Sequence, residues 1–175
     1  MNQKSKIIVV TGPESTGKTT LTKDLAKHYN TSYIPEYARE YIENLQRPYE
    51  YADLEIIAKR QVQDLKDSVD KENGYLFLDT FLIITKVWFD IVYDECPDWI
   101  IDEIENCKVD LFLVCDTTLP WEPDNVRENG GEMREILFER YINELEAFNL
   151  PYEIVTGTGE DRIHSAIQHI QTLFS

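Results

Sequence analysis

One nine-residue segment near the N-terminus combines glycines, a lysine and hydroxyl residues at a spacing suited to binding phosphate. It reads Gly-Pro-Glu-Ser-Thr-Gly-Lys-Thr-Thr. Glycines let the backbone bend so that several N–H groups point at one phosphate, and the positive N-terminal end of the following helix adds to this. Lys18 is placed to reach the β- and γ-phosphates, and the Thr19 hydroxyl to bind Mg²⁺. The residues expected around the phosphates of ATP are Gly12, Pro13, Glu14, Ser15, Thr16, Gly17, Lys18, Thr19 and Thr20.

Two carboxylates follow apolar stretches in a way that suits phosphoryl transfer. Asp79 ends a buried strand predicted over 75–78, and Glu36 follows a short strand predicted over 32–34. Asp79 could hold Mg²⁺ or accept the proton of an acceptor hydroxyl, and Glu36 could bind sugar hydroxyls or be the base. Arg39 lies at i+3 from Glu36 on the same helical face, where it could orient Glu36 or touch the acceptor.

A polar, glycine-bearing stretch at about 121–135 predicts a lid. A kinase must keep water from ATP, so a closing segment is expected. Arg127 and Arg134 are candidates to neutralise charge on the transferred phosphoryl group. Trp121 is the better candidate to stack on a base, because Trp88 sits in an apolar helix and is predicted to belong to the core.

Composition narrows the class of protein. The chain has 175 residues with 17 Lys+Arg and 33 Asp+Glu, a net charge of −16. Such a surface repels nucleic acid and anionic lipid, so we expect neither as a partner. The three cysteines form no CxxC and the three histidines lack metal-ligand spacing. Residues 1–10 are too short a leader for a signal peptide, no stretch suits a membrane helix, and we expect a cytoplasmic protein.

Strands and helices alternate along the chain. Strands are expected at 6–11, 32–34, 75–78, 110–115 and 152–155, and helices at 18–29, 36–45, about 54–69, 81–93, 133–148 and 158–173, the last opened by a Thr158–Asp161 capping box. This order predicts one α/β domain over 1–175, a three-layer sandwich with a parallel sheet and helices on both faces. Ligands gather at the carboxyl ends of such strands, where the phosphate loop, Glu36, Asp79 and Asp116 would meet.

Five blocks resemble the ribosylnicotinamide kinase domain of NadR and its stand-alone relatives, within the P-loop nucleoside and nucleotide kinases. They are GPESTGKTT (12–20), PEYAREY (35–41), FLDT (77–80) and the blocks DLFLVCD and PWxxDxxR within 110–127. The resemblance implies a sheet in the order 2-3-1-4-5 and transfer of the ATP γ-phosphate to the 5′-hydroxyl of nicotinamide riboside.

The resemblance also implies a place in the site for individual residues. It places Glu36, Tyr37 and Arg39 near the acceptor, Asp79 at the reacting centre, and Asp124 and Arg127 in the lid. Asp124 and Trp121 are expected to contact the acceptor together with these residues. The chain departs from the family at residue 81, which is Phe where relatives commonly carry a second aspartate.

Two other functions stay open at the level of sequence. An ATP-binding sensor needs affinity without efficient transfer, which the Phe81 departure would suit. A kinase for another nucleoside would use the same machinery with a different base. In each case ATP with Mg²⁺ is the expected ligand, and a homo-oligomer is possible.

Overall fold

The computed structural model describes residues 5–70 and 74–175; the first four residues, which entered the signal-peptide argument, lie outside this range. The described chain alternates strands and helices as predicted. The elements are β1 (Lys6–Thr11), α1 (Lys18–His28), β2 (Tyr33–Ile34), α2 (Tyr37–Asn44), α3 (Tyr51–Ser68), β3 (Tyr75–Asp79), α4 (Leu82–Tyr93), α5 (Asp98–Glu105), β4 (Leu111–Cys115), α6 (Glu132–Ala147), β5 (Tyr152–Val155) and α7 (Gly159–Phe174).

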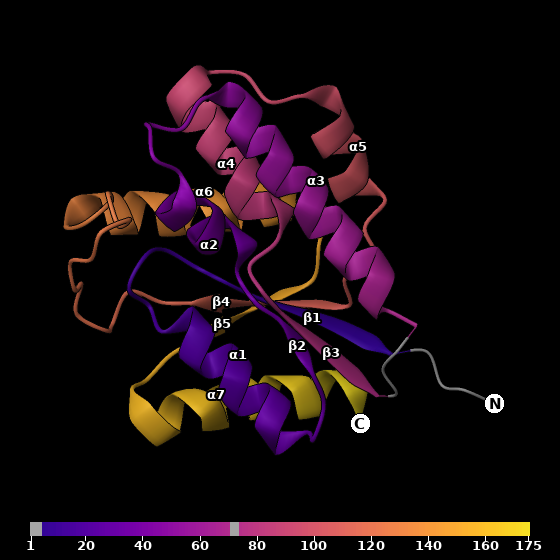
Figure 1. The fold of residues 1–175 in the computed structure, drawn as a ribbon. Coiled ribbons are helices and arrows are strands. Elements are labelled where there is room, and N and C mark those ends of the chain that lie inside the picture. The colour runs from indigo at the N-terminus through magenta and orange to yellow at the C-terminus, as the bar shows by residue number, and fades with distance from the viewer. Residues whose placement is uncertain (1–4, 71–73) are drawn as a thin grey trace.

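The five strands form one parallel sheet in the order β2-β3-β1-β4-β5, which confirms the predicted topology. Helices α1 and α7 cover one face, and α3, α4 and α6 cover the other (Figure 1). Side chains of β1 alternate between the two layers: Ile7 and Val9 pack with the α3–α4–α6 core, and Ile8 and Val10 pack with the α1–α7 core. Burial on both faces explains the continuous apolar run.

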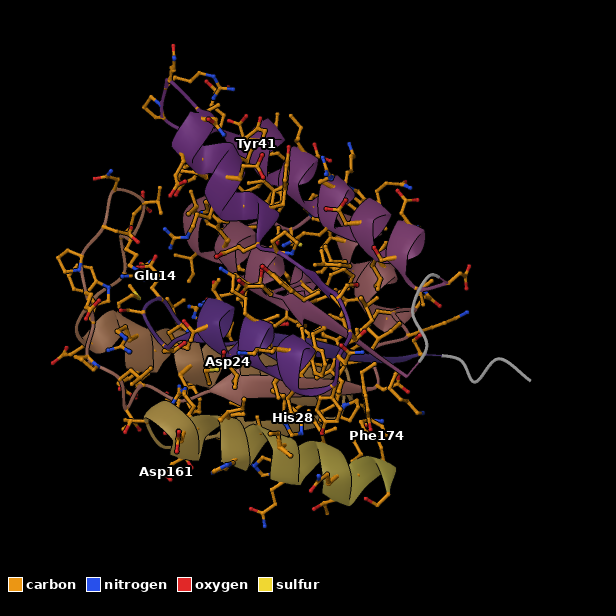
Figure 2. All side chains as sticks on the ribbon, turned by 60° about the horizontal axis from the view of Figure 1, so that its bottom comes forward. Glu14, Asp24, His28, Tyr41, Asp161 and Phe174 are labelled. Atoms are coloured by element: carbon orange, nitrogen blue, oxygen red, sulfur yellow. The ribbon has the colours of Figure 1, made fainter. Side chains whose placement is uncertain are left out.

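All five strands point the same way, so their carboxyl ends share one edge of the sheet. Figure 2 shows Glu14 and Asp161 at this edge, while His28 and Phe174 lie at the opposite end of α1 and α7. His28 thus lies at the end of α1 away from the phosphate loop. The three cysteines are free thiols, with Cys115 fully buried in β4.

Three local predictions differ from the structure. Helix α5 was not predicted, since an eight-residue helix with two buried residues carries little periodic signal. The predicted capping box at the start of α7 is wrong. Thr158 is the N-cap, but the Asp161 N–H donates to the Thr158 backbone carbonyl, and the Thr158 side chain makes no capping bond to a described residue. Leu173, expected on the apolar stripe of α7, is 50% exposed.

No helix in residues 5–70 and 74–175 combines the length and the apolar character that a bilayer crossing requires.

A buried carboxylate joins α2 to α3 and holds the helix that carries Arg39. Asp53 accepts from Tyr41 Oη at 2.7 Å, from Arg47 Nη1 and Nη2 at 2.7 and 2.9 Å, and from the Glu50 N–H at 2.7 Å. The Arg47 guanidinium holds the pKa of this carboxyl well below its usual range. The stability it contributes is therefore complete at neutral pH and is lost as the pH falls toward that depressed pKa.

We expect Asp53→Ala to lower the free energy of unfolding by about 3 kcal/mol at pH 7, because several bonds to a buried charge disappear together. Urea unfolding measures the change. Asp64 is the matched control, since it pairs with Arg60 on the exposed side of the same helix at 2.7 Å. Asp64→Ala is expected to cost less than about 0.5 kcal/mol. Equal effects of the two substitutions would contradict this account.

Candidate nucleotide and acceptor site

The phosphate loop joins β1 to α1, and two glycines give it its shape. Gly12 has φ +140°, and a Cβ placed there would lie 2.7 Å from the Cys115 carbonyl oxygen on the neighbouring strand. Gly17 caps α1 in the left-handed region at φ +75°. Lys18 Nζ donates to the Pro13 carbonyl across the loop at 2.8 Å. The loop thus closes into a ring at the N-terminal end of α1, the arrangement that suits an anion.

Two buried arginines hold the loop from behind through its carbonyl oxygens. Arg162 of α7 donates to the Thr16 carbonyl at 2.9 Å and pairs with Asp116 Oδ1, also at 2.9 Å. Arg134 of α6 donates to the carbonyls of Glu14, Ser15 and Leu119 at 3.1, 3.2 and 2.7 Å.

The prediction that Arg134 neutralises the transferred phosphoryl group is not supported by this geometry, because its guanidinium is engaged by backbone carbonyls. Sequence reasoning did not identify Arg162, which carries no motif of its own.

Asp79 and Thr19 meet at the mouth of the phosphate loop. Thr19 Oγ1 donates to Asp79 Oδ2 at 2.5 Å. The other oxygen, Asp79 Oδ1, is buried and has no hydrogen-bond partner among the described residues. Burial raises the pKa of Asp79, while the Thr19 hydroxyl and Lys18 oppose the shift. A hydroxyl beside a carboxylate oxygen without a partner is the oxygen-donor set that Mg²⁺ prefers, so these residues fit the ion.

Glu36 and Arg39 lie at the start of α2, near Lys18 of the phosphate loop. Arg39 Nε lies 3.8 Å from Glu36 Oε2, and its Nη1 lies 2.9 Å from Asp124 Oδ2 in the 121–135 segment. Burial raises the pKa of Glu36, and nearby Asp79 adds to the shift against the opposing charge of Lys18. Glu36 thus combines a raised proton affinity with a position on the wall of the cavity described next.

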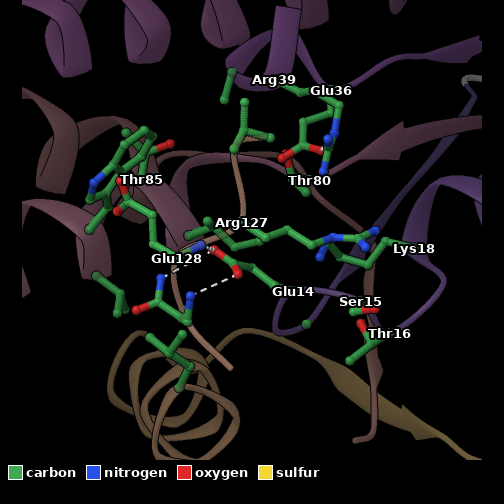
Figure 3. Close-up of a pocket in the computed structure, with 18 of the residues that line it drawn as sticks. Glu14, Ser15, Thr16, Lys18, Glu36, Arg39, Thr80, Thr85, Arg127 and Glu128 are labelled. Carbon is green, nitrogen blue, oxygen red and sulfur yellow. Dashed lines mark hydrogen bonds and ion pairs between the residues drawn. The ribbon is translucent and has the colours of Figure 1, made fainter. Parts of the chain in front are cut away.

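A cavity of about 290 Å³ runs from the phosphate loop to an aromatic end (Figure 3). Lys18, Thr19 and Arg127 line it near the loop, and Glu36 and Arg39 follow. The rest of the wall comes from α2–α4, the connection after α2, the 121–135 segment and α6, and includes Ile42, Tyr49, Gln61, Ile84, Thr85, Trp88, Val126, Glu128, Leu137 and Tyr141.

Four predicted acceptor residues lie outside this lining, and one of them, Asp79, is held by the Thr19 hydroxyl. Tyr37 faces α3, where the Arg60 guanidinium stands 4.8 Å from its ring centroid. Trp121 packs on Gly130, whose Cβ position would lie 3.1 Å from the indole. Asp124 is engaged by Arg39. Trp88 packs against the core as predicted, and it also lines the cavity, because α4 is apolar on several sides.

The segment 121–135 lies over the phosphate loop. Glu14 accepts hydrogen bonds from the N–H groups of Glu128 and Asn129 at 3.2 and 2.9 Å. Arg127 donates to the Glu122 carbonyl at 2.5 Å, and Figure 3 shows its side chain extending toward Lys18. Residues 116–131 contain no helix or strand and are held in place by these side-chain contacts.

A parallel sheet in this strand order, with the phosphate loop after its central strand, defines a P-loop kinase fold. The chain belongs to the AAA_28 family of AAA domains, which it matches over residues 7–162. It also resembles the trifunctional NAD biosynthesis/regulator protein NadR of Salmonella typhimurium, with 25% identity over 144 residues, and that of Escherichia coli, with 26%. These alignments cover 80% of the chain but 35% of each relative. The chain thus corresponds to about a third of the full length of each of these two NadR proteins.

Solved structures agree with this assignment. The chain superposes on a NadR protein in complex with NR with a TM-score of 0.84 and 28% identity, covering 98% of this chain and 52% of that one. Thymidylate kinase from Ehrlichia chaffeensis shares the fold with a TM-score of 0.68 at 16% identity, covering 98% of this chain and the whole of the other. The family resemblance stated from the sequence blocks is confirmed.

Proposed function

We propose that this protein is a kinase that transfers the γ-phosphate of ATP to the 5′-hydroxyl of nicotinamide riboside, giving nicotinamide mononucleotide and ADP. The observation that carries the proposal is a continuous cavity, which begins at the phosphate loop, passes Glu36 and ends among aromatic side chains. The NadR protein solved in complex with NR, with which the chain shares 28% identity, supports the choice of acceptor.

In this proposal the loop amides and Lys18 hold the β- and γ-phosphates of ATP. The N-terminal end of α1 adds partial positive charge beside the triphosphate. Thr19 and Asp79 would hold Mg²⁺, which when bound neutralises charge on the phosphates. The orphaned Asp79 Oδ1 supports this assignment.

Glu36 is the proposed general base. It lines the cavity, whereas Asp79 is 2% exposed and already bonded to Thr19. The Glu36 carboxylate would accept the proton of the acceptor hydroxyl as that oxygen attacks phosphorus, and Arg39 would keep Glu36 oriented. A raised pKa makes this carboxylate a stronger base than an exposed glutamate.

Residues 121–135 form the proposed lid. The bonds from Glu14 to the Glu128 and Asn129 backbone, and the Arg39–Asp124 pair, join this segment to the phosphate loop and to α2. Closure would exclude water and bring Arg127 beside the transferred group. Arg134 would act as a positioning residue that fixes the loop carbonyls.

The proposal is tested by measuring ADP release from Mg-ATP with a panel of nucleosides. We expect nicotinamide riboside to raise ADP release far above the rate without acceptor, and nicotinamide mononucleotide to accumulate at one equivalent per ADP. Competition with common nucleosides identifies a different base preference. Tight ATP binding with no acceptor-dependent ADP release would instead favour the sensor hypothesis.

A further inference from the structure

The end of the cavity away from the phosphate loop contains a buried side-chain amide that is half satisfied. Gln61 of α3 is 8% exposed and lines the cavity. Its Oε1 accepts a hydrogen bond from Thr85 Oγ1 of α4 at 2.8 Å. Its Nε2 has no hydrogen-bond partner among residues 5–70 and 74–175. Nε2 keeps some exposure to the cavity, so a ligand bound there would supply the missing hydrogen-bond partner.

Thr85 determines which half of the amide is available. Its side chain is 1% exposed, and its hydroxyl donates to the Gln61 carbonyl oxygen. That bond uses the acceptor of the amide and leaves the two Nε2 hydrogens as donors toward the cavity. The free half of Gln61 therefore suits a hydrogen-bond acceptor, such as a carbonyl oxygen.

The surroundings of Gln61 suit a flat ring. Trp88 lies at i+3 from Thr85 on α4, and Tyr49 packs against it edge to face, with ring centroids 4.9 Å apart. Both line the cavity. Glu128 adds a carboxylate at 3.5 Å from the Tyr49 hydroxyl. Figure 3 shows Thr85 across the cavity from Lys18, with Glu128 between them. Aromatic faces and a carboxylate favour a ring that carries positive charge.

We infer that Gln61, oriented by Thr85, donates a hydrogen bond from Nε2 to a carbonyl oxygen on the acceptor's ring and selects acceptors that carry one. The inference rests on the proposed function, in which the acceptor is a pyridinium riboside with a carboxamide. A ring without a carbonyl leaves Nε2 unpaired in a site that the lid closes to water. We expect such a ring to lose roughly tenfold in kcat/KM.

Three ribosides separate the possible contacts. Nicotinamide riboside carries both a carbonyl and an amino group, 3-acetylpyridine riboside keeps only the carbonyl, and pyridine riboside has neither. We expect the wild-type protein to use the first two with similar kcat/KM and the third roughly tenfold less well. If 3-acetylpyridine riboside is as poor as pyridine riboside, the contact is to the amino group and the inference is overturned.

Substitution of Gln61 tests whether this residue makes the distinction. In Gln61→Leu and in Gln61→Met, chosen as an unbranched second variant, we expect the three ribosides to differ by less than about twofold. Gln63→Leu is the matched control, because Gln63 is exposed on the same helix and its amide donates to Asp67 at 2.7 Å. It should keep the wild-type preference. A preference that survives both Gln61 substitutions overturns the inference.

Calorimetric binding of the same ribosides separates this inference from the kinase proposal. If no riboside is phosphorylated but binding still requires Gln61 and a ring carbonyl, the kinase proposal fails and the inference stands. If nicotinamide riboside is phosphorylated without any dependence on Gln61, the inference fails and the kinase proposal stands. If the wild-type protein neither binds nor phosphorylates any of the three, both fail.

Discussion

Replacing Lys18 with Ala is expected to lower kcat/KM for phosphoryl transfer by about a thousandfold. Lys18 lies in the lining of the cavity, with its Nζ 2.8 Å from the Pro13 carbonyl oxygen. From this place the ammonium would stabilise the negative charge that spreads over the phosphoryl oxygens as the bond to ADP breaks. Alanine removes the charge and the bond to Pro13, while the bonds from Arg134 and Arg162 to the loop carbonyls remain. Coupled measurement of ADP release with nicotinamide riboside gives the change.

A lysine on the same helix provides the control for charge and helix stability. Lys27 is exposed in the last turn of α1, away from the phosphate loop. Lys27→Ala should keep the wild-type rate, and both variants should unfold near the wild-type temperature. A Lys18→Ala protein that retains a tenth or more of the wild-type rate would contradict the role assigned to this ammonium.

Replacing Glu36 with Gln is expected to lower kcat by about 100- to 10,000-fold while leaving ATP affinity nearly unchanged. The amide keeps the size of the side chain but cannot accept a proton from the acceptor hydroxyl. Glu40→Gln, an exposed change one turn along α2, is the control and should keep the wild-type rate. A Glu36→Gln variant within tenfold of wild type would return the role of base to Asp79.

The pH profile distinguishes the base from a residue that only positions. Only the ionised carboxylate accepts a proton, so the rate falls as the pH drops through its pKa. Burial raises the pKa of Glu36, so we expect the acidic limb above the usual glutamate range. Glu36→Gln should flatten the acidic limb of the pH profile, whereas Asp79→Asn should mainly raise the Mg²⁺ concentration required for half the maximal rate.

The phosphate loop and the sheet could be predicted from local patterns. A buried β-branched run followed by the glycine-lysine motif defines a strand, loop and helix without reference to the rest of the chain, and Asp79 follows from the end of a similar run. The aromatic end of the cavity could not be predicted in this way. Gln61, Thr85 and Trp88 become neighbours because α3 packs on α4, and no spacing within either helix marks them.

The same reasoning explains where two tryptophans lie. The place of Trp121 at the lid entrance favours stacking on a base, yet the bend of the segment puts its ring on Gly130. The apolar character of α4 predicts a core position for Trp88, and Trp88 does pack against the core. That Trp88 also lines the cavity depends on how α4 packs on its neighbours, which its own sequence does not mark.

The two arginines behind the phosphate loop have a consequence for how nucleotide reaches the site. Most of a molecule with net charge −16 repels a triphosphate at long range. Arg134, Lys18 and Arg127 bring positive charge to the loop, whereas the charge of Arg162 is balanced by Asp116. We therefore expect ATP to be attracted only close to the loop, so that its capture depends on ionic strength.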